Sequence, residues 1–293
     1  MTYKTWLITG TSRGFGRLWA TAALERGDKV AATARDTRSL ADLVAKYHDA
    51  VLPIALDVTH RDAAHDAVNA AHEHFGRLDV VVNNAGIGLF GAVEETSEAE
   101  AREQFDTNFF GSLWVAQAAL PLLRAQGGGH ILQISSVLGV TTFPYAGLYN
   151  ATKWAVEGLA QTLASEVAAF GIKTTLIEPG PYGTEWAGSA RRTAPLPAYD
   201  QLRDAFSNSG LVFVDPANTP RIHRSGCSSA QEPARRSPPT TKAASSSGPR
   251  GPTSPPRRTP DRYPDFRYRP EDTDVVTDTV HGREPPSHKH KVD

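Results

Sequence analysis

The most informative stretch of the chain is Thr5-Trp6-Leu7-Ile8-Thr9-Gly10-Thr11-Ser12-Arg13-Gly14-Phe15-Gly16. A short apolar run leads directly into a turn with the spacing Gly-x-x-x-Gly-x-Gly, and a helical pattern begins inside that turn. Glycines let the backbone reverse tightly, and a helix N-terminus offers free N–H groups and a positive dipole end to phosphate. This order predicts a dinucleotide-binding turn, with a purely structural loop as the alternative. Its expected cofactor contacts are Gly10, Ser12, Arg13, Gly14, Phe15 and Gly16.

After this turn, short β-branched runs alternate with longer helical patterns as far as about residue 213. The strand cores are largely apolar, which is typical of strands buried on both faces. The pattern predicts an α/β fold, a Rossmann-like doubly wound parallel sheet in a single domain. The expected strands are Thr5–Thr9, Val30–Thr33, Val51–Ala55, Val80–Asn83, His130–Ser135 and Lys173–Glu178. The expected helices are Gly14–Arg26, Thr37–Tyr47, Arg61–Phe75, Ser97–Leu123 (broken near Asn108) and Tyr149–Phe170.

The composition changes near residue 220. Residues 221–293 hold 12 of the 21 prolines and no leucine, and 14 Lys and Arg against 9 Asp and Glu give a net charge of +5. So little apolar surface cannot offset an ordering entropy of about 1–2 kcal/mol per residue. We therefore predict a domain over residues 1–220, followed by a Pro/Arg/Ser-rich disordered tail over residues 221–293.

Three interpretations of this tail stay open. It is a natural disordered extension, or it is an interaction segment that offers Pro249-Arg250-Gly251-Pro252 as a proline-rich ligand and its arginines as weak nucleic-acid contacts. Alternatively, the reading frame shifts near residue 220, because G+C-rich DNA read out of frame tends to encode Arg, Pro, Ser and Thr. We favour the shifted frame, and we do not expect nucleic acid to be the partner.

The end of the second expected strand bears on the choice of cofactor. Ala34 stands where an acidic residue would bind the ribose 2′-hydroxyl of NAD, and Arg35 follows it. Arg13 adds a second cation within the glycine turn. Two guanidinium groups favour a dianionic 2′-phosphate, so NADP(H) is expected in preference to NAD(H); two solvated surface arginines are the alternative.

A second pattern carries acid–base chemistry. Tyr149 and Lys153 stand four residues apart at the head of a helix, so their side chains share one face. A phenol with a pKa of about 10 is a poor acid or base near neutrality, and an adjacent ammonium would lower that pKa. Ser136 ends a strand 13 residues earlier, where its hydroxyl can reach a substrate oxygen.

Taken together, these pieces resemble the classical short-chain dehydrogenase/reductase family. They occur in the family's order and spacing across roughly residues 5–190. The resemblance implies that Tyr149 is the general acid or base, that Lys153 holds the nicotinamide ribose and tunes Tyr149, and that Ser136 orients the substrate carbonyl. It implies that Asn108 binds a water molecule of a proton relay. The matching residues are Thr9–Gly16, Asp57-Val58, Asn83-Asn84-Ala85-Gly86, Asn108, Ser135-Ser136, Tyr149–Lys153, Pro179-Gly180 and Thr184.

The same resemblance assigns cofactor contacts along the chain. Asp57 and the backbone of Val58 would meet the adenine. The run after the fourth strand would line the cofactor, and the loop after the sixth strand would meet its nicotinamide end. These contacts are Asn84, Ala85 and Gly86 in the run, and Pro179, Gly180 and Thr184 in the loop.

Two features qualify this resemblance. Family members continue to a seventh strand, and residues 221–293 contain no β-rich run of suitable length, so we expect that strand to be missing. A homo-oligomer is usual in the family, and the expected loss of the strand weakens the case for one here. The runner-up hypothesis is therefore a cofactor-binding protein without turnover, a sensor or remnant.

Composition narrows the remaining possibilities. Cys227 is the only cysteine, which excludes an internal disulfide and a multi-cysteine metal site, and no metal site is expected. The chain has no apolar run of about 20 residues, so we expect no membrane span and a cytoplasmic location. An apolar lining above the sheet favours a small hydrophobic ketone, aldehyde or secondary alcohol as substrate. Its candidate members are Leu138, Val140, Phe143, Tyr145, Tyr182 and Trp186.

Overall fold

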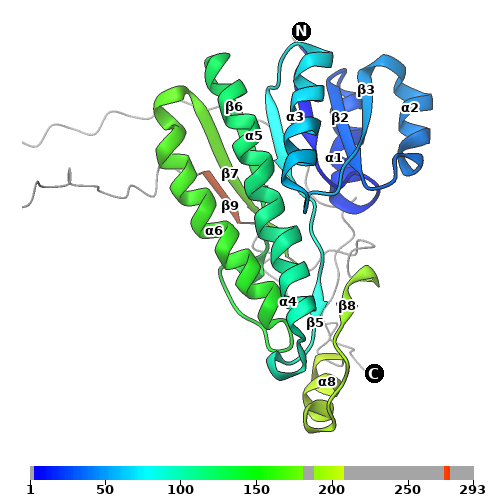
Figure 1. Ribbon diagram of the computed structural model, residues 1–293, viewed down its shortest axis with the longest axis vertical. Coiled ribbons are helices and arrows are strands. Elements are labelled where there is room, and N and C mark those ends of the chain that lie inside the picture. Colours follow the sequence, from blue (N-terminus) through cyan, green and yellow to red (C-terminus); the bar gives the residue numbers. More distant parts are fainter. Residues whose placement is uncertain (1–2, 181–187, 208–273, 278–293) are drawn as a thin grey trace, which may run out of the picture. The chain divides into compact units, whose positions relative to one another are not determined.

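The computed structural model describes residues 3–180, 188–207 and 274–277. Parallel strands form a sheet in the order β3-β2-β1-β4-β6-β7-β9, flanked by helices, which confirms the predicted Rossmann-like doubly wound fold (Figure 1). The strands are β1 (Thr5–Ile8), β2 (Lys29–Ala34), β3 (Val51–Ala55), β4 (Val80–Asn83), β6 (Gly129–Ile134), β7 (Ile172–Glu178) and β9 (Asp274–Thr277). The helices are α1 (Gly14–Glu25), α2 (Ala41–Tyr47), α3 (Arg61–Phe75), α4 (Glu98–Phe105), α5 (Gly111–Ala125), α6 (Gly147–Val167) and α8 (Asp200–Ser207).

Alternate residues of the central strands enter two separate cores. Leu7 and Val81 pack with residues of α3 and α5 on one face, whereas Ile8 and Val82 pack with residues of α1 and α2 on the other. All four side chains are buried, because successive side chains of a strand point to opposite faces and both faces are covered. This two-sided burial explains the continuous apolar runs in the sequence.

The long helix expected over Ser97–Leu123 is broken where the sequence predicted. Ser97 and Glu100 form a capping box at the start of α4, which ends at Phe105. A π-helical turn then spans Asp106–Phe110, and α5 begins at Gly111. Such single turns insert one extra residue into a helix and are frequent at functional sites.

The expectation that the chain lacks its last strand is not met. The strand β9 pairs in parallel with β7 at the edge of the sheet, with Asp274 opposite Thr175 and Thr277 opposite Glu178. Residues 221–293 contain no β-rich run of the expected length, but an edge strand has a single neighbour and can be short. Val275 and Val276 are an adjacent β-branched pair in this strand. Strand β9 lies within the range 221–293 that was predicted to be disordered, and the rest of that range, residues 221–273 and 278–293, lies outside the described residues.

Membrane-spanning helices and clusters of metal-binding side chains are both absent from the described residues. Within those ranges, no helix combines the length and the apolar character that a bilayer crossing requires. The same ranges contain no group of three or more His, Cys, Asp or Glu side chains placed to hold a metal ion.

Close packing joins the first turn of the chain to the end of β4. The Asn84 side-chain amide donates to the carbonyl oxygens of Thr9 (2.8 Å) and Gly10 (3.1 Å), and the backbone N–H of Asn84 donates to Thr9 Oγ1 (2.9 Å). A Cβ atom on Gly16 would lie only 2.3 Å from the Gly10 oxygen and 2.5 Å from Asn84 Nδ2. Glycine at position 16 therefore lets α1 start against this junction.

We expect Gly16→Ala to destabilise the protein by about 1–3 kcal/mol, because the methyl group overlaps a backbone oxygen that cannot move freely. Gly158→Ala is the matched control. A Cβ at Gly158 meets no atom within 4 Å, and alanine in the middle of α6 should stabilise it by about 0.5–1 kcal/mol. Urea unfolding of the two variants measures both changes. A Gly16→Ala protein as stable as the native one would contradict the packing argument.

Candidate active site

A cavity of about 840 Å³ opens where the parallel strands end, a volume typical of small-molecule sites. It lies at the point where strand order reverses between β1 and β4. Gly16 and Asn108 are not part of its lining, and Thr184 lies outside the described residues. The predicted site residues that line it are Gly10, Ser12, Arg13, Gly14, Phe15, Arg35, Asp57, Val58, Asn84, Ala85, Gly86, Ser136, Tyr149, Lys153, Pro179 and Gly180.

The glycine turn has the conformation that a phosphate-binding loop needs. Gly10 and Gly14 have φ angles of +70° and +58°, which favour glycine. Thr11 ties the turn to β2, because its backbone N–H and hydroxyl both donate to the Thr33 oxygen. The first turn of α1 carries no acidic residue, and the Arg13 side chain does not cap it. This end of the cavity therefore fits the anionic part of a dinucleotide.

Two arginines stand at this end of the cavity. Arg13 precedes α1 and Arg35 directly follows β2, and both side chains line the cavity. Asp57 is held by the backbone N–H of Thr59 (3.0 Å) and by its hydroxyl (2.8 Å). Burial opposes ionisation of Asp57, but these hydrogen bonds and the nearby charges of His60 and Arg35 outweigh it and lower the pKa of the carboxyl. The arginines give this end a net positive charge.

The first turn of α6 brings the two predicted acid–base groups together. Tyr149 is 7% and Lys153 6% exposed, and the Lys153 ammonium lies 5.7 Å from the centre of the Tyr149 ring. Burial raises the pKa of Tyr149 to about 12, against the opposing hydrogen bond with Ser136. Burial lowers the pKa of Lys153 to about 8, against the opposing charge of Glu157. In the free protein, Tyr149 therefore keeps its proton near neutral pH, and Lys153 holds its proton less tightly than usual.

Hydrogen bonds orient the groups around this pair. The Lys153 Nζ donates to the Ile134 oxygen at the end of β6 (2.7 Å), so two of its three donors are left over. Ser136 caps a short 3₁₀ turn, and its Oγ accepts from the backbone N–H of Leu138 (3.2 Å). The Ser136 hydroxyl proton is thus available to a partner other than Leu138.

Asn108 connects α6 to the loop after β4. Its side-chain amide exchanges hydrogen bonds with the backbone of Ile87, accepting from the N–H (2.8 Å) and donating to the oxygen (3.0 Å). It also donates to the Thr152 hydroxyl (3.1 Å), which in turn donates to the backbone carbonyl oxygen of Tyr149 (2.8 Å). Asn108 is 1% exposed and sits in the π-helical turn. Its predicted role in a water relay stays a prediction.

Sequence reasoning missed one buried acid beside this pair. Glu157 is 5% exposed and stands one helical turn after Lys153. Burial raises the pKa of Glu157, and nearby Ser135, Gln161 and the Lys153 charge oppose that rise. The four-residue spacing from Lys153 is the signal that could have identified it, because it places both side chains on one face of α6.

Aromatic side chains line part of the cavity, but the residues differ from those predicted. Of the predicted lining, Leu138 and Phe143 line the cavity, whereas Val140 and Tyr145 do not, and Tyr182 and Trp186 lie outside the described residues. Phe206 of α8 was missed; its ring lies 5.7 Å from that of Phe143. It also lies 5.2 Å from the ring of Phe90, another lining residue that no motif in the sequence marks.

Comparison with known proteins identifies the family. Residues 4–195 match the short chain dehydrogenase family. The chain belongs to this family. It is 45% identical over 208 residues to "Oxidoreductase BOA17" of Botryotinia fuckeliana (strain B05.10), an alignment that covers 70% of this chain and 76% of that protein. It is 35% identical over 234 residues to a 3-ketodihydrosphingosine reductase of Bacteroides thetaiotaomicron, covering 80% and 84%. The chain is thus an oxidoreductase of a family that acts on CH–OH or C=O groups.

Solved structures extend this comparison to the cofactor. A short-chain dehydrogenase from Streptomyces avermitilis is 41% identical, with a TM-score of 0.69 over 74% of this chain and 80% of that chain. ElxO with NADP bound is 31% identical (TM-score 0.60, 71% and 79% covered). A 3-ketoacyl-(acyl-carrier-protein) reductase from Brucella melitensis complexed with NADH is 27% identical (TM-score 0.63, 73% and 86% covered). Structural neighbours of this fold therefore bind nicotinamide dinucleotides of both kinds.

The effect of the Glu157 charge on the pKa of Lys153 can be tested directly. In the free protein, we expect the Lys153 ammonium to lose its charge as pH rises through about 8. Glu157→Gln removes a negative charge that favours the ammonium, so the pKa of Lys153 should fall further. NMR titration of ¹⁵N-labelled lysine side chains, with Lys153→Met to assign the signal, measures both values. Glu166→Gln, an exposed acid on the same helix, should leave the titration unchanged; an equal shift in both variants would argue against a specific interaction.

Proposed function

We propose that the chain is an NADP(H)-dependent oxidoreductase that transfers a hydride between the nicotinamide and a carbonyl or secondary alcohol of a small hydrophobic substrate. The observation that carries this proposal is the burial of Tyr149 and Lys153, one helical turn apart, in the cavity that the glycine turn also lines. Ser136 lines the same cavity and interacts with the Tyr149 hydroxyl.

In the proposed mechanism, Tyr149 is the acid or base and Ser136 orients the substrate. When bound, the reduced cofactor supplies a hydride to the carbonyl carbon. The Tyr149 hydroxyl gives its proton to the carbonyl oxygen, and the reverse transfer accompanies alcohol oxidation. The Ser136 hydroxyl donates a hydrogen bond to that oxygen and stabilises the charge that develops on it. The raised pKa of Tyr149 supports this role in the free protein, because the phenol is protonated before reduction begins.

Lys153 has two proposed roles. Its two remaining N–H donors can bind the ribose hydroxyls, since one is used by Ile134. Its charge next to the ring stabilises the phenolate that forms when Tyr149 has lost its proton. We propose that Asn108, through its position in the π-helical turn, holds a water molecule that returns a proton to this pair.

We further infer a preference for NADP(H) over NAD(H). Arg13 and Arg35 both line the cavity where the adenosine end of the dinucleotide would lie, and Ala34 stands in place of the acid that NAD would require. Guanidinium groups bind phosphate through paired, charge-assisted hydrogen bonds. The adenine would contact Asp57 and Val58, the run Asn84–Gly86 would line the middle of the cofactor, and the nicotinamide end would meet Pro179, Gly180 and Thr184.

Replacing the proposed acid tests the mechanism. Tyr149→Phe should lower kcat for ketone reduction by about 10²–10⁴-fold while leaving NADPH affinity nearly unchanged, because the ring stays and the proton donor is lost. NADPH consumption with a panel of ketones and aldehydes gives kcat, and NADPH fluorescence gives affinity. Tyr3→Phe, an exposed tyrosine, is the control. Full activity in Tyr149→Phe would contradict the mechanism, and NADPH binding by the native chain without any turnover would favour the sensor or remnant hypothesis.

Reversing one charge tests the cofactor preference. Arg35→Asp should shift the ratio of kcat/KM for NADPH to that for NADH by about 10- to 100-fold toward NADH, the worth of a hydrogen bond to a charged group. Arg38→Asp makes the same charge change three residues later, outside the cavity. The ratio should change little in this control. If both variants give the same ratio as the native protein, the 2′-phosphate is bound elsewhere.

A further inference from the structure

A short parallel strand pair forms one wall of the cavity near the catalytic helix. Strands β5 (Leu89–Phe90) and β8 (Arg191–Arg192) pair so that Phe90 lies opposite Arg192. The backbone N–H of Gly91, just after β5, donates to the backbone carbonyl oxygen of Tyr145 (2.9 Å), which lies shortly before α6. The pair is therefore anchored to the start of the helix that carries Tyr149.

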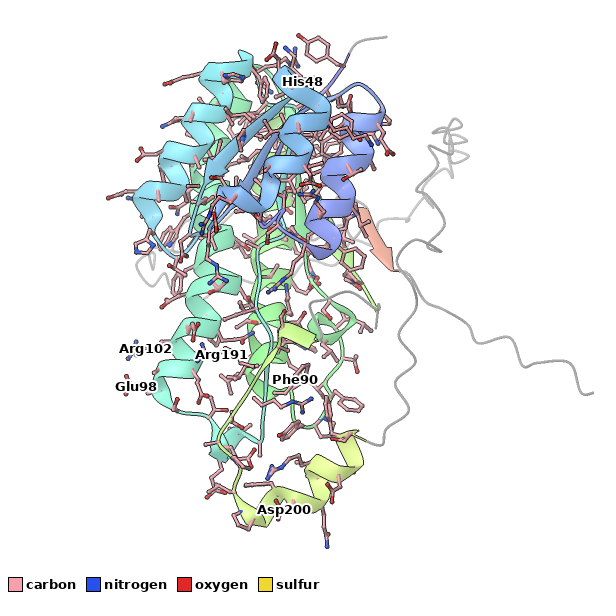
Figure 2. The ribbon with its side chains drawn as sticks, turned by 90° about the vertical axis from the view of Figure 1, so that its right-hand side faces the viewer. His48, Phe90, Glu98, Arg102, Arg191 and Asp200 are labelled. Atoms are coloured by element: carbon pink, nitrogen blue, oxygen red, sulfur yellow. The ribbon has the colours of Figure 1, made fainter. Side chains whose placement is uncertain are left out.

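The two arginines of β8 have different surroundings, because successive side chains of a strand point to opposite sides. Arg191 forms an ion pair with Glu103 of α4, so its side chain bridges from β8 to α4 (Figure 2). Arg192 instead lines the cavity, together with Phe90, Phe143 and Phe206. Within the described part of the chain, the Arg192 guanidinium has no hydrogen-bond or ion-pair partner.

The charge balance at this end of the cavity is positive. Glu103 also lines the cavity, but its charge is compensated by Arg191. The other charged lining groups of the described chain belong to the proposed cofactor site: Arg13, Arg35, Asp57 and Lys153. Arg192 is thus a cation with five N–H donors that lines the same cavity as three aromatic rings. An apolar ligand body can pack on the rings while an anionic group on the ligand binds the guanidinium.

We infer that the substrate is an oxo acid or hydroxy acid, with an apolar body against Phe90, Phe143 and Phe206 and a carboxylate bound by Arg192. This inference rests on the proposed function and adds to it the class of substrate. The planar guanidinium matches a carboxylate through two parallel hydrogen bonds, which would fix the orientation of the carbonyl relative to Tyr149.

A set of aromatic oxo acids and their methyl esters tests the inference. Phenylglyoxylate, benzoylpropionate and benzoylbutyrate place the carboxylate at increasing distances from the carbonyl, and each ester keeps the shape without the charge. With the native full chain and NADPH, we expect at least one acid to exceed its ester in kcat/KM by about 10- to 100-fold. Arg192→Gln should abolish that preference by lowering kcat/KM for the acid toward that for the ester, and Arg192→Lys should retain part of it.

Arg102→Gln is the matched control, because Arg102 is an exposed arginine of α4 that pairs with Glu98 and does not line the cavity. It should keep the native preference for acids. Equal kcat/KM for acid and ester, or a preference that survives in Arg192→Gln, overturns the inference and leaves the proposed function standing, because esters are still reduced.

If no member of the set is reduced, the proposed function fails for this panel and binding decides the inference. Calorimetric titration of the NADPH-mixed full chain with phenylbutyrate should then give a Kd that is at least about tenfold weaker in Arg192→Gln than in the native protein. The same Kd in both proteins overturns the assignment of Arg192. Thermal unfolding of each variant establishes that the comparison is made between folded proteins.

Discussion

The Asn84 amide holds the first turn of the chain against the end of β4, and the candidate site is built around that junction. Its two hydrogen bonds satisfy the carbonyl groups of Thr9 and Gly10, which directly follow β1. Because Gly16 has no side chain, α1 can begin against the same atoms. The junction therefore sets the direction of the helix N-terminus, and with it the place where a dinucleotide phosphate can bind.

Burial in α6 has opposite effects on the pKa values of Tyr149 and Lys153. The same exclusion of water that raises the pKa of Tyr149 lowers that of Lys153, because in each case the neutral form is favoured. As a result of the two pKa shifts, one cavity contains a protonated phenol and an ammonium group that loses its proton more easily than usual. Glu157 partly opposes the change at Lys153. In the free protein, Tyr149 thus carries its proton, and the charge of Lys153 beside it depends on Glu157.

Much of the fold could be predicted because its strands are buried on both faces, and such strands leave a strong apolar signal, as in β4. The cavity-lining residues after β1, β4 and β7 followed from motifs with fixed spacing. The pairing of β5 with β8 could not be predicted, because two-residue strands have no periodicity and their partners are far apart in the chain. The position of Phe206 in the cavity could not be predicted either, because it depends on packing against Phe90, which lies far away in the chain. The short edge strand β9 was missed because a pair of valines gives too little apolar signal.

The residues that line the cavity come from two different parts of the chain. The groups proposed for the dinucleotide come mainly from the turns that follow β1, β2 and β4, whereas Arg192 and Phe206 come from a segment after β7. Under the proposed function, substitutions in that late segment would alter which compounds are accepted without disturbing the junction at Asn84.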